Sequence, residues 1–85
     1  MNATYDRLAK LLVEVMGLED DEVQPTGTFG ELDVDSLAMV ELVLAAQKEF
    51  GIEIADDDIT GDMTVEQAAA VIDAAVIDAK AVPGR

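Results

Sequence analysis

Apolar residues recur at helical spacing in three stretches of the chain. The first stretch, from Thr4 to Met16, repeats them three and four residues apart, which predicts an amphipathic helix with one buried face. The positions expected to be buried are Leu8, Leu11, Leu12 and Val15. Gly17 is placed to end this helix, because glycine readily adopts the left-handed conformation common at helix C-termini. The third stretch starts with Thr64-Val65-Glu66-Gln67, a capping box, and keeps helical spacing as far as Ala79.

The second apolar stretch has two apolar faces. Asp35 is suited to cap the start of a helix and Gly51 its end, so a helix is predicted between them. At about 100° per residue, one side of it forms a core face: Met39, Leu42, Val43, Ala46 and Phe50. The opposite side carries a second stripe, bordered by two charges: Leu37, Val40 and Leu44, with Glu41 and Lys48. A surface helix buries one face, so the second stripe is left for solvent, a partner or a bound apolar group, unless a neighbouring segment covers it.

The connections between these helices complete the predicted fold. Residues 17–35 form a long acidic loop, of a length that is often functional. Its expected anchors on the core are Val23, Phe29 and Leu32. Residues 52–55 alternate apolar and polar, which predicts an extended piece, and one short helical turn is expected over Asp56–Thr60. The fold class is all-α, a small bundle of three long helices and one short helix. Residues 1–80 are expected to form one domain and residues 81–85 a disordered tail.

The composition describes one acidic domain. The chain has 85 residues, a net charge of −14, and 19 acidic against 5 basic residues. Such a field repels nucleic acid and anionic membranes and attracts basic protein surfaces. The absence of cysteine excludes a disulfide scaffold and thiol catalysis by the chain itself. No apolar run reaches membrane-spanning length and no signal-peptide pattern is present, so a cytoplasmic protein, expected to be a monomer, is the prediction.

The candidate chemistry centres on Ser36, within Asp35-Ser36-Leu37 at the start of the second predicted helix. Free backbone N–H groups and the helix dipole favour a phosphate at such a position. A serine in a first helical turn is also common for structural reasons alone. The chain has no histidine, and Lys48 is the only basic side chain between Leu11 and Ala79. Because a serine nucleophile needs a nearby base, the pattern predicts a modification site served by another enzyme, in a chain that is not itself an enzyme.

A second acidic segment raises calcium binding as an alternative. Counted from Asp56, the positions of Asp58, Thr60 and Gly61 follow an EF-hand loop. The last ligand position is Gln67, however, which supplies no bidentate carboxylate, and no second loop is present to pair with. No specific metal site is therefore expected, only weak binding of divalent cations by clustered carboxylates. An acidic calcium-binding helical protein and a plain interaction domain without a cofactor remain alternatives.

Three stretches together resemble a bacterial acyl carrier protein. They are Asp33-Val34-Asp35-Ser36-Leu37-Ala38-Met39-Val40-Glu41-Leu42, then Glu49-Phe50-Gly51-Ile52-Glu53-Ile54 with Asp56-Asp57-Asp58, and Thr64-Val65-Glu66-Gln67-Ala68. The likeness covers about residues 4–80. It implies a four-helix bundle in which Ser36, flanked by Asp35 and Leu37, receives 4′-phosphopantetheine from coenzyme A. Acyl intermediates would travel on that arm as thioesters between the enzymes of fatty acid synthesis.

The resemblance also implies partners and a surface for them. The partners are a phosphopantetheinyl transferase that needs Mg²⁺, and an acyltransferase, a ketosynthase and other synthase enzymes that dock through basic patches. The implied docking residues are Leu37, Val40, Glu41, Leu44, Glu49, Glu53 and Asp57.

The chain departs from this family pattern at three places. Ala55 stands where proline is frequent, Ala38-Met39 replaces a polar pair, and Lys48 puts a positive charge near the docking stripe. These departures leave a discrete carrier of a polyketide or other secondary-metabolite pathway as the alternative to fatty acid synthesis. A peptidyl carrier is disfavoured, because Val34-Asp35 stands where that family has glycines, and a D-alanyl carrier is a further minority option.

Overall fold

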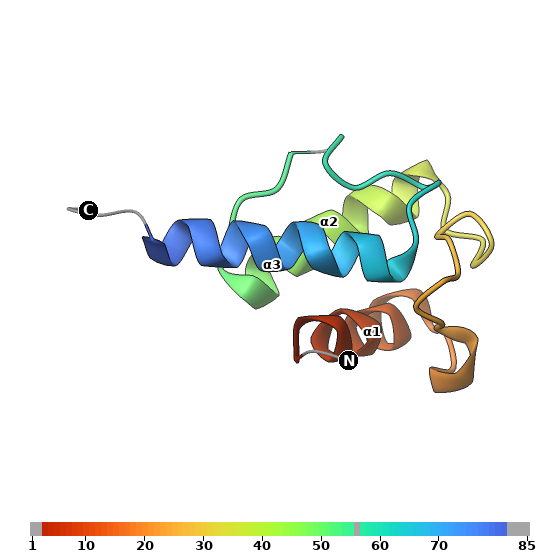
Figure 1. Ribbon diagram of the computed structural model, residues 1–85. Helices are drawn as coiled ribbons and strands as arrows, with labels where there is room; N and C mark the ends of the chain where they lie inside the picture. Colours follow the sequence, from red (N-terminus) through yellow and green to blue (C-terminus); the bar gives the residue numbers. More distant parts are fainter. Residues whose placement is uncertain (1–2, 56, 82–85) are drawn as a thin grey trace.

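The computed structural model describes residues 3–55 and 57–81, and these form an all-helical domain (Figure 1). The elements are α1 (Ala3–Met16), the short 3₁₀ helix η1 (Asp20–Glu22), α2 (Ser36–Phe50) and α3 (Val65–Ala81). Within the described residues no strand is present, and the one β-like feature is an isolated antiparallel bridge between Thr28 and Thr64. No helix in this part of the chain is long and apolar enough to cross a membrane. The all-α class predicted from the sequence is confirmed.

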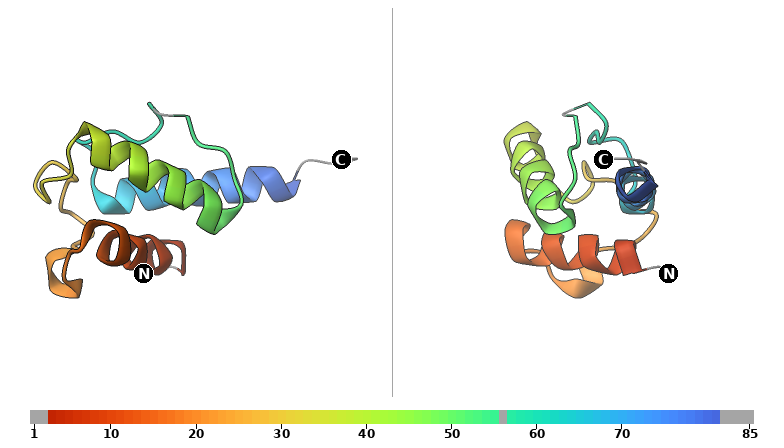
Figure 2. Two further views of the ribbon diagram at one scale, coloured as in Figure 1. Left: turned by 180° about the vertical axis from the view of Figure 1, so that it is seen from behind. Right: turned by 90° about the vertical axis from the view of Figure 1, so that its left-hand side faces the viewer.

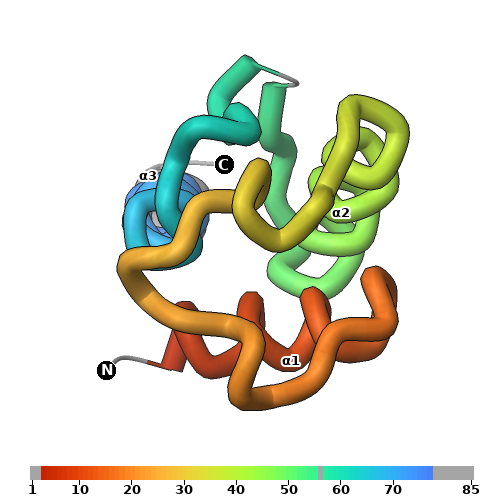
Figure 3. Tube along the Cα trace, turned by 90° about the vertical axis from the view of Figure 1, so that its right-hand side faces the viewer, coloured from red at the N-terminus to blue at the C-terminus, as the bar shows by residue number. Residues whose placement is uncertain are grey.

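The three α-helices are arranged with α1 crossing beneath α2 and α3 (Figures 1 and 2). α1 packs against both of the other helices. Residues 17–35 wrap around one end of the molecule, and residues 51–55 and 57–64 lie between the end of α2 and the start of α3 (Figure 3). This leaves α2 at the edge of the molecule, with one side facing away from the other helices.

The helix ends lie where the sequence places them, because their signals are local. Gly17, with a φ of 72°, follows α1 in the left-handed conformation. Asp35 is the N-cap of α2, and Gly51 closes that helix with a φ of 66°. At the start of α3 the Thr64 N–H donates to Gln67 Oε1 at 2.9 Å, and the Gln67 N–H donates to Thr64 Oγ1 at 3.1 Å. The predicted capping box is therefore present in both directions.

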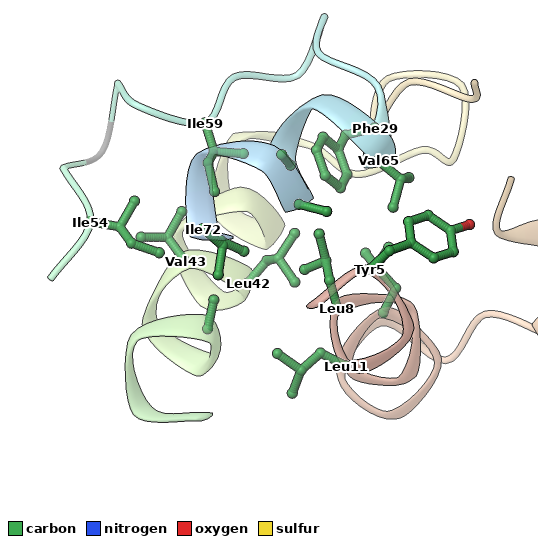
Figure 4. Close-up of a cluster of buried hydrophobic side chains, with 14 of the residues drawn as sticks. Tyr5, Leu8, Leu11, Phe29, Leu42, Val43, Ile54, Ile59, Val65 and Ile72 are labelled. Atoms are coloured by element: carbon green, nitrogen blue, oxygen red, sulfur yellow. The ribbon is translucent and has the colours of Figure 1, made fainter. Parts of the chain in front are cut away.

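The core fills the space that the three helices enclose (Figure 4). Its largest fully buried side chains are Phe29, Leu8, Leu12, Leu42, Ile72 and Val65. Phe29 reaches this core from the loop before α2, which confirms its expected role as an anchor. Val15 does not belong to the core, because its side chain is 37% exposed near the end of α1, and the prediction for it was wrong. Tyr5, one turn from Leu8, is buried in the same helix.

One further expectation, a short helix over Asp56–Thr60, differs from what the described residues show. Over Asp56–Thr60 the structure has a turn at residues 57 and 58 and a bend at Ile59 in place of a short helix, and Asp56 lies outside the described residues. Ile59 is nevertheless buried at 3% exposure, so this segment is held by an apolar contact with the core. The short helix that is present, η1, lies in the connection between α1 and α2. The expected tail at 81–85 lies outside the described residues, apart from Ala81, which ends α3.

Candidate functional site

Ser36 is the first residue of α2, and it is exposed. The preceding residue, Asp35, is in an extended conformation, and its carboxylate accepts a hydrogen bond from the Ala38 N–H at 2.8 Å. This cap satisfies one of the N–H groups that a helix start leaves without a partner. Among the described residues, no hydrogen bond engages the Ser36 hydroxyl or the N–H groups of Ser36 and Leu37. The chain's single serine therefore presents a free hydroxyl beside free N–H donors.

A tight turn before Asp35 sets the direction from which the chain enters α2. The Val34 N–H donates to the Phe29 carbonyl at 3.0 Å, and the Val34 side chain is buried. Asp33 lies between them with a φ of 62°, in the left-handed region that aspartate tolerates better than most residues. Because Phe29 and Val34 are both held in the core, the start of α2 is fixed relative to it.

The same turn is also bound to the start of α3. Residues 25–30 and 61–66 run side by side and exchange several backbone hydrogen bonds. One of these joins the Gly30 N–H to the Gly61 carbonyl at 2.9 Å. Two segments far apart in the sequence thus meet at the end of the molecule that carries Ser36. Sequence reasoning did not anticipate this contact, since neither segment has strand periodicity.

A pocket of about 270 Å³ opens beside Ser36. Its lining comes from α2 and from the segment between α2 and α3: Ser36, Met39, Val40, Val43, Ile59, Thr60 and Gly61. Most of these side chains are apolar, so the pocket suits a small apolar group more than a charged one. For scale, an apolar cavity of about 150 Å³ is large enough to bind benzene. The sequence indicated the α2 residues as apolar but gave no sign that residues 59–61 would face them.

The predicted second stripe of α2 is exposed. Leu37 is 70% exposed, Leu44 58% and Val40 45%. The opposite face carries the buried residues of this helix, Leu42, Val43 and Ala46. Glu41 is also exposed and follows Val40 directly in the sequence. In the described structure neither a helix nor the long loop covers the stripe, so an apolar surface with an acidic neighbour lies beside Ser36.

The three other acidic residues expected at the docking surface lie further away from Ser36. Glu49 is in the last turn of α2 and forms an ion pair with Arg7 of α1, with 3.0 Å between Arg7 Nη2 and Glu49 Oε2. Glu53 is exposed in the extended segment that follows α2, and Asp57 is exposed in the turn after it. The structure therefore gathers the apolar stripe and Glu41 on one face, while Glu49 is partly neutralised by its pairing.

In the acidic segment with EF-hand spacing, Asp58 and Asp62 take part in local hydrogen bonds, and Asp56 lies outside the described residues. Asp58 accepts from the Ala55 N–H, and the Thr60 hydroxyl donates to Asp62. Gln67, at the last ligand position, accepts the Thr64 N–H in the capping box. No group of three or more carboxylates placed to hold a metal ion occurs in residues 3–55 and 57–81.

Comparison with known proteins finds relatives over most of the chain. A family model described as "Phosphopantetheine attachment site" matches residues 6–72. An acyl carrier protein of Zymomonas mobilis subsp. mobilis is 42% identical over 74 residues, which cover 86% of this chain and 95% of the relative. An acyl carrier protein of Acidothermus cellulolyticus is 44% identical over 73 residues, which cover 85% of this chain and 87% of the relative.

Proposed function

Because this chain belongs to the acyl carrier protein family, we propose that it carries acyl intermediates of fatty acid synthesis on 4′-phosphopantetheine attached to Ser36. The observation that carries the proposal is the position of the chain's single serine, exposed at the first residue of α2 and inside the matched region. In this proposal the protein is a carrier that other enzymes load and unload, and not a catalyst. Its proposed location is the cytoplasm.

The residues around Ser36 fit a phosphodiester at its hydroxyl. The free N–H groups of Ser36 and Leu37 and the positive end of the α2 dipole stabilise negative charge there. Asp35 keeps the first turn of the helix closed through its bond to the Ala38 N–H. The nearby acidic side chains repel a phosphate, but a covalent bond to Ser36 would hold the phosphate in place despite this repulsion. When attached, the arm supplies the thiol on which acyl groups are held as thioesters, a group that this chain lacks.

The pocket beside Ser36 is proposed to receive a short acyl group. Its apolar lining comes from Met39 and Val43 of α2 and from Ile59 of the segment that follows α2. We further propose that residues 57–60, which form a turn and a bend, take the place of the short helix in the four-helix bundle expected for the family. The burial of Ile59 supports this assignment.

The exposed stripe of α2 is proposed to be the docking surface for the phosphopantetheinyl transferase, acyltransferase and ketosynthase. Leu37, Val40 and Leu44 supply its apolar centre, and Glu41 an acidic edge. An apolar centre with a charged rim is the usual composition of a modest protein interface. Long-range attraction between the net charge of −14 and basic partner patches speeds encounter without requiring tight binding.

The test is intact-mass measurement after incubation with coenzyme A, Mg²⁺ and a broad-specificity phosphopantetheinyl transferase. The wild-type chain is expected to gain one phosphopantetheine, and Ser36→Ala none. Thr60→Ala is the matched control, because Thr60 also presents a hydroxyl at the same pocket, and this variant should gain the full increment. A wild-type chain that stays unmodified while folded, or a Ser36→Ala variant that is still modified, contradicts the proposal.

A further inference from the structure

The exposed stripe of α2 ends in a positive charge. Lys48 follows Leu44 by four residues and Leu37 by eleven, so it lies within about 40° of both around the helix axis. The lysine is exposed and belongs to the last turn of α2. The surface proposed for docking therefore runs from Ser36 at one end to Lys48 at the other, and these two residues are about 18 Å apart along the helix.

No acidic side chain of the described residues forms an ion pair with Lys48. The one salt bridge found in this part of the chain joins Arg7 to Glu49. Arg7 donates three hydrogen bonds to Glu49, two to its carboxylate at 3.2 and 3.0 Å and one to its backbone carbonyl at 2.8 Å, and so holds it toward α1. The neighbours of Lys48 one turn away in the sequence are Leu44, Ala45, Gly51 and Ile52. A lysine without a partner thus remains at the end of an exposed apolar stripe.

The surface has exposed acidic residues at both ends, since Glu49 and Glu53 follow Lys48 in the sequence, but a cation only at the Lys48 end. At the serine end Asp33, Asp35 and Glu41 are all exposed. At the far end stands Lys48, the only basic side chain between Leu11 and Ala79. Since charges are screened over about 8–10 Å at moderate ionic strength, the acidic residues at the serine end do not cancel the preference of Lys48 for a negative group.

We propose that Lys48 selects partners, and that the enzymes docking on α2 present a carboxylate opposite Lys48 in addition to basic residues opposite the serine end. This inference rests on the proposed carrier function and adds the charge pattern that a matching partner must have. A partner patch that is basic along its whole length meets repulsion at Lys48, whereas a patch with an acidic residue there gains an ion pair at the rim.

A simpler explanation assigns Lys48 to the helix alone, because a cation in the last turn of a helix interacts favourably with the helix dipole. That interaction is internal to the chain and predicts no change in recognition. A second simple explanation treats the chain as a uniform acidic field. It predicts that any replacement of a lysine by glutamate speeds association with basic partners. The three explanations therefore predict different changes in recognition when Lys48 is replaced by glutamate: weaker recognition for partner selection, no change for the helix dipole, and faster association for a uniform acidic field.

The measurement is kcat/KM for two enzymes from the same source acting on the phosphopantetheine-loaded chain. They are an acyltransferase that loads an acyl group onto the arm and a ketosynthase that uses the loaded chain. Lys48→Glu is compared with Lys10→Glu, since Lys10 is an exposed lysine on α1, away from the stripe. Each replacement lowers the net charge by the same amount, so the pair separates position from overall charge. Intact mass establishes the loading of every variant before kinetics.

Lys48→Glu is expected to lower kcat/KM by about 3- to 10-fold with at least one of the two enzymes, while Lys10→Glu leaves it unchanged or raises it. Lys48→Arg is expected to keep the wild-type value, because it keeps the charge. The loss should shrink as salt is raised from about 0.01 M to about 1 M, where the screening length falls from about 30 Å to about 3 Å.

Zero-length carbodiimide cross-linking of the wild-type chain to the same enzymes gives a readout that does not depend on a variant. A cross-link between the Lys48 amine and a partner carboxylate is expected, and mass spectrometry distinguishes it from links within the chain. The inference is overturned if Lys48→Glu matches or exceeds Lys10→Glu with both enzymes, or if Lys48 yields no link to either enzyme. A wild-type chain that gains no phosphopantetheine overturns the carrier function itself, and that failure is visible in the mass before any kinetics.

Discussion

Replacing Arg7 by alanine tests how the C-terminal end of α2 is fastened to α1. The Arg7 guanidinium donates to Glu49 Oε2 from Nε at 3.2 Å and from Nη2 at 3.0 Å, and to the Glu49 carbonyl at 2.8 Å. Its Cζ atom also lies 4.4 Å from the centroid of the Phe50 ring. One side chain thus provides an ion pair, a bond to a carbonyl in the last turn of α2 and a cation–π contact.

The expected loss is about 1–2 kcal/mol of unfolding free energy. The ion pair is about half exposed, at 49% for Arg7 and 44% for Glu49, so about 0.2–1 kcal/mol is a fair value for it. The cation–π contact adds about 0.5–1 kcal/mol, and the hydrogen bond to the carbonyl about 0.5–1.5 kcal/mol. These contributions share one side chain and overlap, so their sum is an upper bound. At about 4–8 °C per kcal/mol for a domain of this size, Tm should fall by about 5–15 °C.

The assay is urea and thermal unfolding followed by circular dichroism, with Lys10→Ala as the control for loss of an exposed basic residue from the same helix. Arg7→Lys keeps the charge and loses the planar fork and the stacking, so it should recover less than half of the loss. If Arg7→Ala and Lys10→Ala had equal Tm values, the contacts of Arg7 would contribute nothing beyond charge. Full recovery by Arg7→Lys would refute the assignment of the effect to the guanidinium geometry.

Two further predictions concern other parts of the fold. The Ile54 N–H donates to Gln47 Oε1 at 2.9 Å, so Gln47→Ala removes its acceptor and should speed hydrogen exchange at Ile54. Gln47→Glu is the control, because it keeps an acceptor. Unchanged exchange at Ile54 in the alanine variant would contradict this prediction. Tyr5 has its pKa raised above 10.0, first by burial and then by Asp6 and Glu66. Absorbance titration of this single tyrosine should therefore give a higher midpoint in the folded than in the denatured chain. The folding stability that this raised pKa contributes is complete at pH values below the pKa of Tyr5 in the unfolded chain, and it is lost as the pH rises through the pKa of Tyr5 in the folded chain. Equal midpoints in the folded and denatured chains would refute the raised pKa.

The parts of the fold that the sequence predicted are those determined by neighbouring residues. The cap at Asp35, the left-handed Gly51 and the Thr64–Gln67 box depend on contacts within one helical turn, and all three are present. The exposure of the stripe beside Ser36 was predictable for a similar reason. The core face of α2 was identified by its period, and a helix at the edge of a small domain has one side left over.

The parts that were not predicted depend on residues distant in the sequence. Val15 continues the apolar period of α1 and yet is exposed, because burial at the end of a helix depends on what lies opposite. The Arg7–Glu49 pair joins residues 42 positions apart, and no local pattern marks it. The pocket beside Ser36 likewise needs residues 59–61 to fold back toward α2.

Both ends of α2 are held in place by the rest of the chain, while its outer face is left uncovered. At the serine end, the turn before the helix is bonded to the segment before α3, including the Gly30–Gly61 bond. At the other end, Arg7 holds the last turn against α1. A helix fixed in this way presents its exposed residues in a constant arrangement, so a partner does not have to order the surface when it binds.

That arrangement also explains how one surface can be recognised by several enzymes and still be released. The exposed apolar stripe comprises the side chains of Leu37, Val40 and Leu44, a small area that on its own suits a transient interface more than a stable one. Charges at its rim mainly change the rate of association and the choice of partner. Affinity can therefore stay low while specificity is set by the pattern of charge, acidic beside Ser36 and basic at Lys48. A carrier that must bind each enzyme briefly and then leave gains more from such a pattern than from a larger apolar surface.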